Sequence, residues 1–244
     1  MDLNIYLSPV SEFLNGSYQK NQLGDVIQIH KEGLPNLEGA KIALVGVEDD
    51  RNAFQNDGCA NGPDRIRQYF YQLYAGEGFP PIVDLGNIKA GAEVSDTYHA
   101  VSKVVEELVK QKVIPFIIGG GQDLTFANYL AYENLEQLVN LVTVDSRFDI
   151  GIDLEEPLTS RSFIGKILTH QPNILFNYTN IGYQTYFVSD EVLELMEKLY
   201  FDSIRLGRVR ESMQEVEPMV RNADIISFDV GSIKASDAPG NKNA

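Results

Sequence analysis

The sequence predicts an α/β fold, with three α/β/α layers and a mainly parallel central sheet. Two observations lead to this fold class. Strand-like and helix-like segments alternate along the chain. The strand-like segments are also continuous apolar and β-branched runs, which are typical of strands buried on both faces of a parallel sheet. Because nothing separates the 244 residues into two halves, one domain is expected over 41–244, after an irregular lead-in with some helix over 1–40.

In the first half of the chain, apolar runs predict strands at 41–47, 82–85 and 113–118. A helix is expected to begin at Gly62-Pro63, because a proline in the first turn lacks only an N–H that the helix does not use. Its apolar stripe is expected to be Ile66, Tyr69, Phe70 and Leu73. Ser95 or Asp96 is expected to cap the next helix, with Tyr98, Val101, Val105 and Leu108 on one face.

The second half continues the alternation of strands and helices. Helices are expected at 124–136, 161–169, 189–199 and 208–221, and strands at 139–144, 173–182, 203–206 and 224–230. A polar loop is expected over 151–160. No tandem repeat or low-complexity tract interrupts this order.

Composition narrows the class of protein. The chain has 35 acidic and 20 basic residues, a formal net charge of −15, which argues against a nucleic-acid partner. No apolar run approaches the roughly 20 residues of a membrane span, so no membrane partner is expected. A single cysteine, Cys59, excludes an internal disulfide framework, and the N-terminus does not resemble a signal peptide. A soluble, cytoplasmic protein is therefore expected.

Carboxylates stand at the ends of three predicted strands. Asp145 and Asp149 follow the strand at 139–144, Asp123 follows the strand at 113–118, and Asp229 ends the last strand. Since parallel strands deliver their carboxyl ends to one edge of a sheet, we expect these aspartates to converge. A lone aspartate would be read as a surface or capping residue, but three such strand ends favour a site for a hard cation such as manganese, magnesium or calcium.

The glycine triplet Gly119–Gly121 allows two interpretations. A glycine-rich turn after a strand can cradle phosphate, but this one lacks both the Gly-x-Gly-x-x-Gly spacing and a following Lys-Ser or Lys-Thr. The favoured interpretation is a tight strand-to-helix turn that needs positive φ. Nucleotide binding stays open as a third functional alternative.

Three segments in this order, Gly-Gly-Gly-Gln-Asp, Asp-Ser-Arg-Phe-Asp and Ser-Phe-Asp-Val, resemble the arginase/ureohydrolase superfamily and its formimidoylglutamase-like branch. The resemblance covers roughly residues 40–240 and includes Gly62-Pro63 with Ile66-Arg67, and the segment 84–88. It implies a hydrolase of linear amidines that uses two manganese ions to activate water. By this resemblance Asp123 is a residue behind the metal ligands, and the loop hydroxyls of Ser160 and Ser162 are possible substrate contacts.

The chain departs from the family at three of the six ligand positions that the resemblance implies. Gln122 and Arg147 stand where the family has histidine, and Gly231 replaces a carboxylate. One ion would keep Gln122, Asp145, Asp149 and Asp229, whereas the other loses both of its own ligands. At most one manganese ion is therefore expected. The histidines, His30, His99 and His170, lie outside these segments and are interpreted as ordinary helix or loop residues, so no catalytic residue is assigned.

Arg147 is expected to replace the lost cation. Convergent buried carboxylates are costly without a positive charge, and a guanidinium binds carboxylates in a two-pronged arrangement. If Arg147 neutralises the aspartates in this way, no metal is expected.

Two functions stay open. The favoured one is a ureohydrolase-like protein with an eroded dimanganese centre, acting in binding or scaffolding as a homo-oligomer, with a small amidine or amino-acid-like ligand. The other is a working amidine hydrolase of the formimidoylglutamase, agmatinase or arginase type. By resemblance, the family fold continues beyond the end of this chain with a strand in the middle of the sheet. Its absence is expected to leave two strands with unpaired backbone and an apolar gap.

Overall fold

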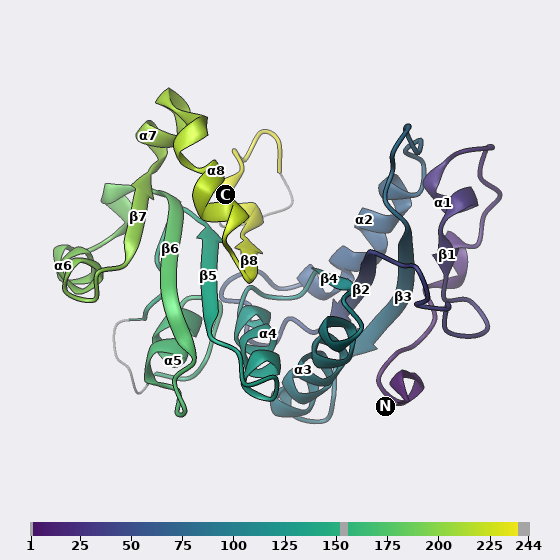
Figure 1. Ribbon diagram of the computed structural model, residues 1–244, viewed down its shortest axis with the longest axis horizontal. Coiled ribbons are helices and arrows are strands. Elements are labelled where there is room, and N and C mark those ends of the chain that lie inside the picture. Colours follow the sequence, from purple (N-terminus) through teal and green to yellow (C-terminus); the bar gives the residue numbers. More distant parts are fainter. Residues whose placement is uncertain (1, 152–155, 239–244) are drawn as a thin grey trace. The chain divides into compact units, whose positions relative to one another are not determined.

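The computed structural model of the chain describes residues 2–151 and 156–238. The chain forms two compact units, each with its own parallel sheet (Figure 1). The first unit comprises Met1–Arg51 and Asp57–Gly121, and the second comprises Asn52–Asn56 and Gln122–Ala244. The predicted α/β class is thereby confirmed, and the prediction of one domain over 41–244 stays a prediction.

The first unit has a four-stranded parallel sheet in the order β1-β3-β2-β4. Its strands are β1 (Gln28–Ile29), β2 (Ile42–Glu48), β3 (Ile82–Lys89) and β4 (Ile114–Ile118). Its helices are α1 (Leu23–Val26), α2 (Gly62–Phe70) and α3 (Val94–Lys110), with short 3-10 turns at Leu3–Ile5, Glu12–Leu14 and Cys59–Asn61. Strand β1 lies in the expected irregular lead-in, where two residues are too few to show a period.

Helix α2 begins at Gly62 with Pro63 in its first turn, as predicted. Of its expected apolar stripe, Phe70 packs against the core and the other three residues are exposed. Ile66, Tyr69 and Leu73 are 46%, 71% and 56% exposed. The helix instead turns Pro63 and Arg67 toward the sheet. A buried arginine with ionic partners takes the place that the apolar pattern had assigned to aliphatic side chains.

Arg67 joins the two short segments that carried the family resemblance in this unit. Its Nε and Nη2 donate to the two oxygens of Asp84, each at 2.8 Å, and Nη2 also donates to the carbonyl oxygen of Gly86 at 2.9 Å. The hydroxyl of Tyr71 donates to Asp84 at 2.8 Å. Arg67 and Asp84 are fully buried, so this ion pair fixes α2 against β3.

Helix α3 starts earlier than predicted. Its N-cap is Glu93, and Asp96 completes a capping box in which each side chain bonds the other's backbone. The predicted apolar face is confirmed, because Tyr98, Val101 and Val105 are buried.

The second unit also has a four-stranded parallel sheet, in the order β7-β6-β5-β8. Its strands are β5 (Val139–Val144), β6 (Leu175–Tyr183), β7 (Asp202–Arg205) and β8 (Ile225–Phe228). Its helices are α4 (Leu124–Glu133), α5 (Phe163–Thr169), α6 (Asp190–Lys198), α7 (Leu206–Glu211) and α8 (Glu217–Arg221), with 3-10 turns at Thr185–Phe187, Met213–Glu215 and Val230–Ser232. The helix predicted over 208–221 is broken into three short pieces around Ser212 and Val216.

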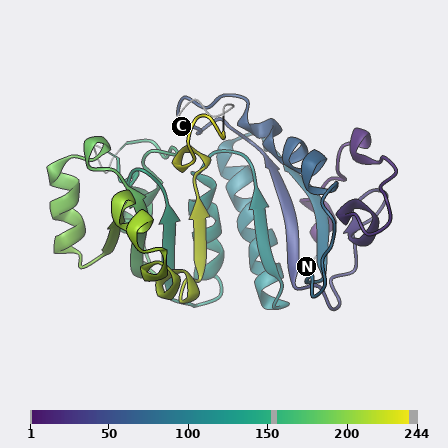
Figure 2. The same cartoon turned by 90° about the horizontal axis from the view of Figure 1, so that it is seen from above.

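Helices cover both faces of this second sheet (Figure 2). Ser227 of β8 bonds Thr125 of α4 on one face, with 2.6 Å between the hydroxyl oxygens. On the other face, Val142 and Ile181 pack with Val209 of α7. Successive side chains of a strand point to opposite faces of the sheet. Val142 pairs with Ile226, the residue before Ser227, so Val142 and Ser227 point to opposite faces.

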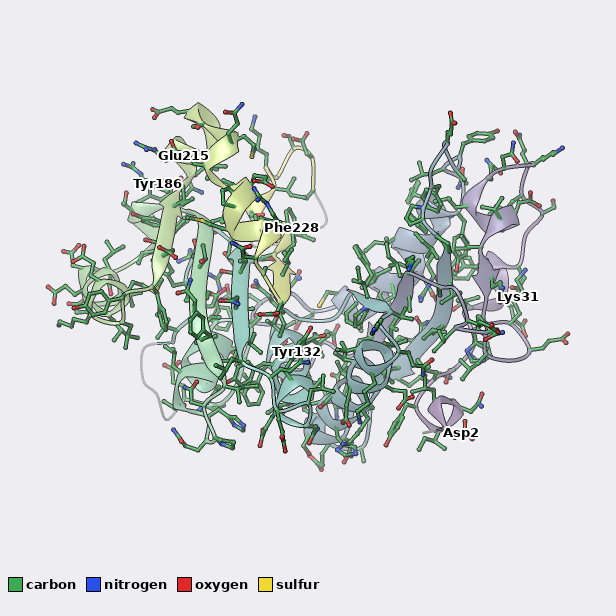
Figure 3. The ribbon with its side chains drawn as sticks, viewed as in Figure 1. Asp2, Lys31, Tyr132, Tyr186, Glu215 and Phe228 are labelled. Carbon is green, nitrogen blue, oxygen red and sulfur yellow. The ribbon has the colours of Figure 1, made fainter. Side chains whose placement is uncertain are left out.

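Strands β4 and β8 each pair with a single neighbour among the described residues. Ile114 and Phe116 of β4 are 63% and 56% exposed. Ile226 and Phe228 of β8 are 52% and 55% exposed, and Phe228 projects from the strand (Figure 3). The further strand that the resemblance implies stays a prediction. Residues 239–244 lie outside the described residues.

Candidate carboxylate site

The second sheet brings two of the predicted aspartates together at the ends of neighbouring strands. Val144 pairs with Phe228 in the parallel β5–β8 register, so Asp145 and Asp229 leave the same edge. The N–H of Asp229 donates to the carbonyl oxygen of Val144 at 3.0 Å, which continues the ladder into the site. Asp149 returns to this edge through a tight turn in which its own φ is 49°.

The carboxylates differ in their hydrogen bonds. Asp145 is 2% exposed and its Oδ1 accepts from the N–H of Arg147 at 2.9 Å. Its Oδ2 is buried and accepts no hydrogen bond from the described residues. Oδ1 of Asp229 accepts from the N–H of Gly231 at 2.9 Å. The site therefore has a buried carboxylate oxygen with capacity for a further partner.

Burial raises the pKa of Asp145, Asp149 and Asp229. For Asp149 the pKa lies well above its ordinary value, first because of burial and then because of the charge of Asp145. For Asp145 the effect of burial is opposed by a hydrogen bond from the Asp149 carboxyl. The raised pKa of Asp149 follows the behaviour of two adjacent carboxylates, where the charge of one opposes ionisation of the other.

The prediction for Arg147 is wrong. Its Nη1 donates to the carbonyl oxygen of Phe187 at 3.0 Å, and its guanidinium carbon lies 4.2 Å from the centre of the Phe187 ring. Burial and the neighbouring charge of Arg161 lower the pKa of Arg147. A guanidinium stacks well on an aromatic face, and no pattern in the sequence indicates that Phe187 lies within reach.

Among the described residues, Arg161 lies beside Asp149 as a cation. Its Nη1 lies 3.8 Å from Oδ1 of Asp149. Its charge opposes the rise in pKa at Asp145, Asp149 and Asp229. The sequence showed a cation between the hydroxyls of Ser160 and Ser162, but the positive charge at the aspartates was assigned to Arg147. The position of Arg161 beside Ser160, in the expected substrate loop, could have indicated that its guanidinium lies at the site.

Gln122 and Asp123 lie where the second unit begins, ahead of α4. The Gln122 amide donates to Ser227 at 3.3 Å, and its buried Oε1 accepts no hydrogen bond from the described residues. Asp123 is the N-cap residue of α4 and is 4% exposed. The predicted carbonyl ligand at Gln122 thus has a free acceptor, while Asp123 keeps its expected place behind the site as a prediction.

Gly231 is the position where the family resemblance implies a second carboxylate. A Cβ there would lie 2.8 Å from Oδ2 of Asp229, closer than real Cβ contacts. A side chain at this position would force the Asp229 carboxylate to move. The glycine therefore allows Asp229 to fold back onto the backbone N–H of residue 231.

Ser160 and Ser162 hold the loop in place in this structure. The N–H of Phe54 donates to the Ser160 hydroxyl at 2.9 Å, and the Ser162 hydroxyl donates to the carbonyl oxygen of Pro157 at 2.8 Å. Ser162 is also 2% exposed. Their suggested role as substrate contacts stays a prediction. Residues 152–155 of the predicted loop lie outside the described residues.

The donor set fits one hard cation better than two. Asp145, Asp149, Asp229 and the Gln122 carbonyl are all oxygen donors, and two of their oxygens lack a partner among the described residues. However, the described part of the chain contains no group of three or more His, Cys, Asp or Glu side chains arranged to hold a metal ion. Closing around an ion would therefore require the Asp229 or Asp149 carboxylate to move.

The three histidines have partners elsewhere. Nδ1 of His30 lies 2.9 Å from the carbonyl oxygen of Leu85, and the ring of His99 packs edge-on against Tyr6. Nε2 of His170 lies 2.9 Å from a carboxylate oxygen of Glu133. Their interpretation as ordinary structural residues agrees with these contacts.

The glycine triplet forms the predicted tight turn. Gly119 and Gly120 have φ of 84° and 72°. A Cβ on Gly119 would also collide with the Pro63 ring. Backbone geometry thus accounts for these glycines without a phosphate. As for a membrane, no helix in the described ranges is long and apolar enough to cross one.

Comparisons with known proteins agree with the fold and the order of the segments. A sequence model described as "Arginase family" matches residues 40–243. The formimidoylglutamase of Staphylococcus haemolyticus is 25% identical over 196 residues, covering 70% of this chain and 62% of that protein. That of Photorhabdus laumondii is 27% identical over 199 residues, covering 76% and 62%. This chain therefore spans less than two thirds of the length of both relatives.

Solved structures show the same fold. The formiminoglutamase of Trypanosoma cruzi with Mn²⁺ has a TM-score of 0.75 at 20% identity, covering 89% of this chain and 77% of that one. The formimidoylglutamase of Bacillus subtilis has a TM-score of 0.75 at 18% identity, covering 92% and 75%. At these identities the structures establish the shared fold alone.

Proposed function

Because this chain belongs to the arginase family, we propose that it is a ureohydrolase-like protein with an eroded metal centre. It holds at most one divalent cation, manganese by analogy with its structural neighbours, and its hydrolytic activity is impaired. One observation carries the proposal. The candidate site contains carboxylates, an amide and guanidinium groups, whereas the three histidines of the chain make their contacts elsewhere.

The residues that would hold a cation are Gln122, Asp145, Asp149 and Asp229. A bound divalent cation supplies a water of lowered pKa and polarises the substrate. Proton transfer by a positioned side chain contributes about 10²- to 10⁴-fold to such reactions. None of these four residues carries an imidazole, so we expect this contribution to be lost. We therefore expect slow turnover.

A working amidine hydrolase is the second candidate. The buried oxygens Asp145 Oδ2 and Gln122 Oε1, which accept no hydrogen bond from the described residues, favour it. Buried oxygens of this kind are costly unless a proton donor or a cation meets them. One ion bound there would restore part of the family's chemistry.

The ligand and the assembly are part of the proposal. A small amidine or an amino-acid-like molecule suits the family relationship. Ile66, Tyr69 and Leu73 form an exposed apolar face on and just beyond α2, and such faces often mark protein contacts. This supports a homo-oligomer. Placement in the cytoplasm is likewise proposed and agrees with the single cysteine.

Metal content and product release test the proposal. The protein is loaded with MnCl₂, freed of excess metal, and assayed for manganese and for formamide or urea from N-formimidoyl-glutamate, agmatine and arginine. We expect no more than one manganese per chain and turnover far below the 1–10³ s⁻¹, roughly, of ordinary enzymes. Two manganese ions per chain with ordinary turnover contradict the proposal. One ion with ordinary turnover selects the second candidate.

A further inference from the structure

The sequence contains two Asn-Gly pairs, Asn15-Gly16 and Asn61-Gly62, and both lie in the first unit. An asparagine followed by glycine can lose its side-chain amide without an enzyme. The backbone nitrogen of the glycine reaches the amide carbon easily, because no Cβ stands in its way. Both asparagines are exposed, but the backbone around the two pairs differs.

Asn15-Gly16 lies in an irregular segment that follows the 3-10 turn Glu12–Leu14. The N–H of Asn15 donates to the carbonyl oxygen of Glu12 at 2.9 Å. The amide group of Asn15 and the N–H of Gly16 make no hydrogen bond with the described residues. A Cβ built on Gly16 would meet no atom within 4 Å. The side chain of Asn15 and the nitrogen of Gly16 are therefore free to approach each other.

Residues on either side hold this segment at the surface of the unit. Leu14 is 2% exposed and belongs to the core. The hydroxyl of Tyr18 donates to the carbonyl oxygen of Leu14 at 2.7 Å, and its ring packs edge-on against Tyr71 with 5.7 Å between the ring centres. Residues 15–17 thus form a short exposed loop between two anchored residues, so the reaction does not require the unit to unfold.

Asn61-Gly62 is held by the start of helix α2. The N–H of Gly62 donates to the carbonyl oxygen of Cys59, which closes the preceding 3-10 turn. The Asn61 amide donates to the carbonyl oxygen of Gly58 at 3.4 Å. Because Gly62 is also the first residue of α2, its nitrogen attacks the Asn61 side chain only after the start of the helix opens.

We propose that Asn15 is a site of spontaneous deamidation and that the fold protects Asn61 from the same reaction. Hydroxide takes the proton of the Gly16 nitrogen, which then attacks Cγ of Asn15. A bond forms between that nitrogen and Cγ, and the Cγ–Nδ2 bond breaks. Nδ2 leaves as ammonia with a proton from water, which restores the hydroxide. Water then opens the resulting succinimide ring at either carbonyl, giving aspartate or isoaspartate.

The reaction changes both the charge and the backbone of the first unit. Either product carries a new carboxylate, which makes the net charge of −15 more negative by one unit. In isoaspartate the chain runs through Cγ, which adds a methylene carbon to the loop that the Tyr18–Leu14 hydrogen bond closes.

Peptide mapping of the full chain, incubated at neutral pH, tests this proposal. Trypsin cleaves after lysine and arginine, so the two Asn-Gly pairs fall in separate peptides, 1–20 and 52–65. Mass spectrometry follows the loss of each amide, and chromatography separates aspartate from isoaspartate. We expect Asn15 to react at least about tenfold faster than Asn61 in the native protein, because opening of α2 must precede the reaction at Asn61.

The matched variant is Gly16→Ala. The backbone of Gly16 is outside the left-handed region and a Cβ there meets no neighbour, so the variant is expected to fold like the wild type. Its Cβ hinders the attacking nitrogen, and we expect Asn15 to react at least about tenfold more slowly in it. In urea, where helix α2 is unfolded, we expect Asn15 and Asn61 of the wild type to react at similar rates.

Equal rates for Asn15 and Asn61 in the native protein overturn the proposal. So does a Gly16→Ala variant that loses the Asn15 amide as fast as the wild type. A difference between the two asparagines that persists in urea overturns the protection assigned to α2.

Discussion

Replacing Arg67 with methionine tests whether the ion pair beneath α2 holds the first unit together. Methionine keeps an unbranched apolar stem, shorter than that of arginine, and removes the charge. Asp84 then keeps hydrogen bonds from Tyr71 and from the N–H of Gly86, at 2.8 and 2.9 Å, but loses both guanidinium contacts. Its carboxylate is fully buried and has no route to water.

The expected cost is large. Removing one partner of a buried ion pair costs about 3–5 kcal/mol, because the other charge stays buried without compensation. Since domains are stable by only about 5–15 kcal/mol, this is a substantial part of the total. For a chain of this size, about 2–4 °C per kcal/mol predicts a fall in Tm of roughly 6–20 °C.

Urea unfolding followed by circular dichroism measures the effect. The matched control is Arg65→Met on the same helix, because Arg65 is exposed and its side chain bonds only Gln68 among the described residues. The control is expected to change stability by less than about 0.5 kcal/mol. A loss below about 1 kcal/mol for Arg67→Met, or equal losses in the two variants, would refute the reasoning about burial.

Three further predictions concern other parts of the chain. Without metal, Asp149→Asn is expected to be more stable than the wild type at neutral pH. The raised pKa of Asp149 means that the folded state binds its proton more tightly than the unfolded state. The free energy of unfolding of the wild type therefore falls as pH rises from the ordinary pKa of 3.8 to the raised pKa of Asp149. If the urea midpoints of the two proteins change with pH by the same amount, this prediction is excluded. Gly119→Ala is expected to lose at least about 1 kcal/mol in the same assay, because φ is 84° and the new Cβ meets Pro63; unchanged stability would contradict it. Phe228→Thr is expected to leave the urea midpoint within about 0.5 kcal/mol of the wild type, because the side chain is 55% exposed, and a loss above about 2 kcal/mol would show that it is packed.

The sequence predicted the strands of the second unit and their carboxyl-end aspartates well. Those features depend on local patterns, such as the apolar run at β5 followed by Asp145. It failed at α2, where the spacing of Ile66, Tyr69 and Leu73 suggested a buried stripe. The helix instead buries Arg67, because Asp84, seventeen residues away, compensates its charge. An ion pair between residues that are distant in the sequence leaves no periodic pattern in it.

The cation at the candidate site also depends on contacts between residues that are distant in the sequence. Arg147 was assigned to the aspartates because it stands between them in the chain. In the structure it stacks on Phe187, forty residues away, and Arg161 approaches Asp149 from the loop before α5. The convergent aspartates indicated the need for a positive charge, whereas the identity of the arginine depended on the path of a loop.

Electron paramagnetic resonance of the manganese-loaded protein tests the central claim most directly. The claim is that the pocket at the ends of β5 and β8 holds no more than one divalent cation. The account predicts, at saturation, the six-line spectrum of an isolated Mn²⁺ with no more than one ion per chain. An exchange-coupled spectrum from a pair of Mn²⁺ ions, with two ions per chain, would contradict it.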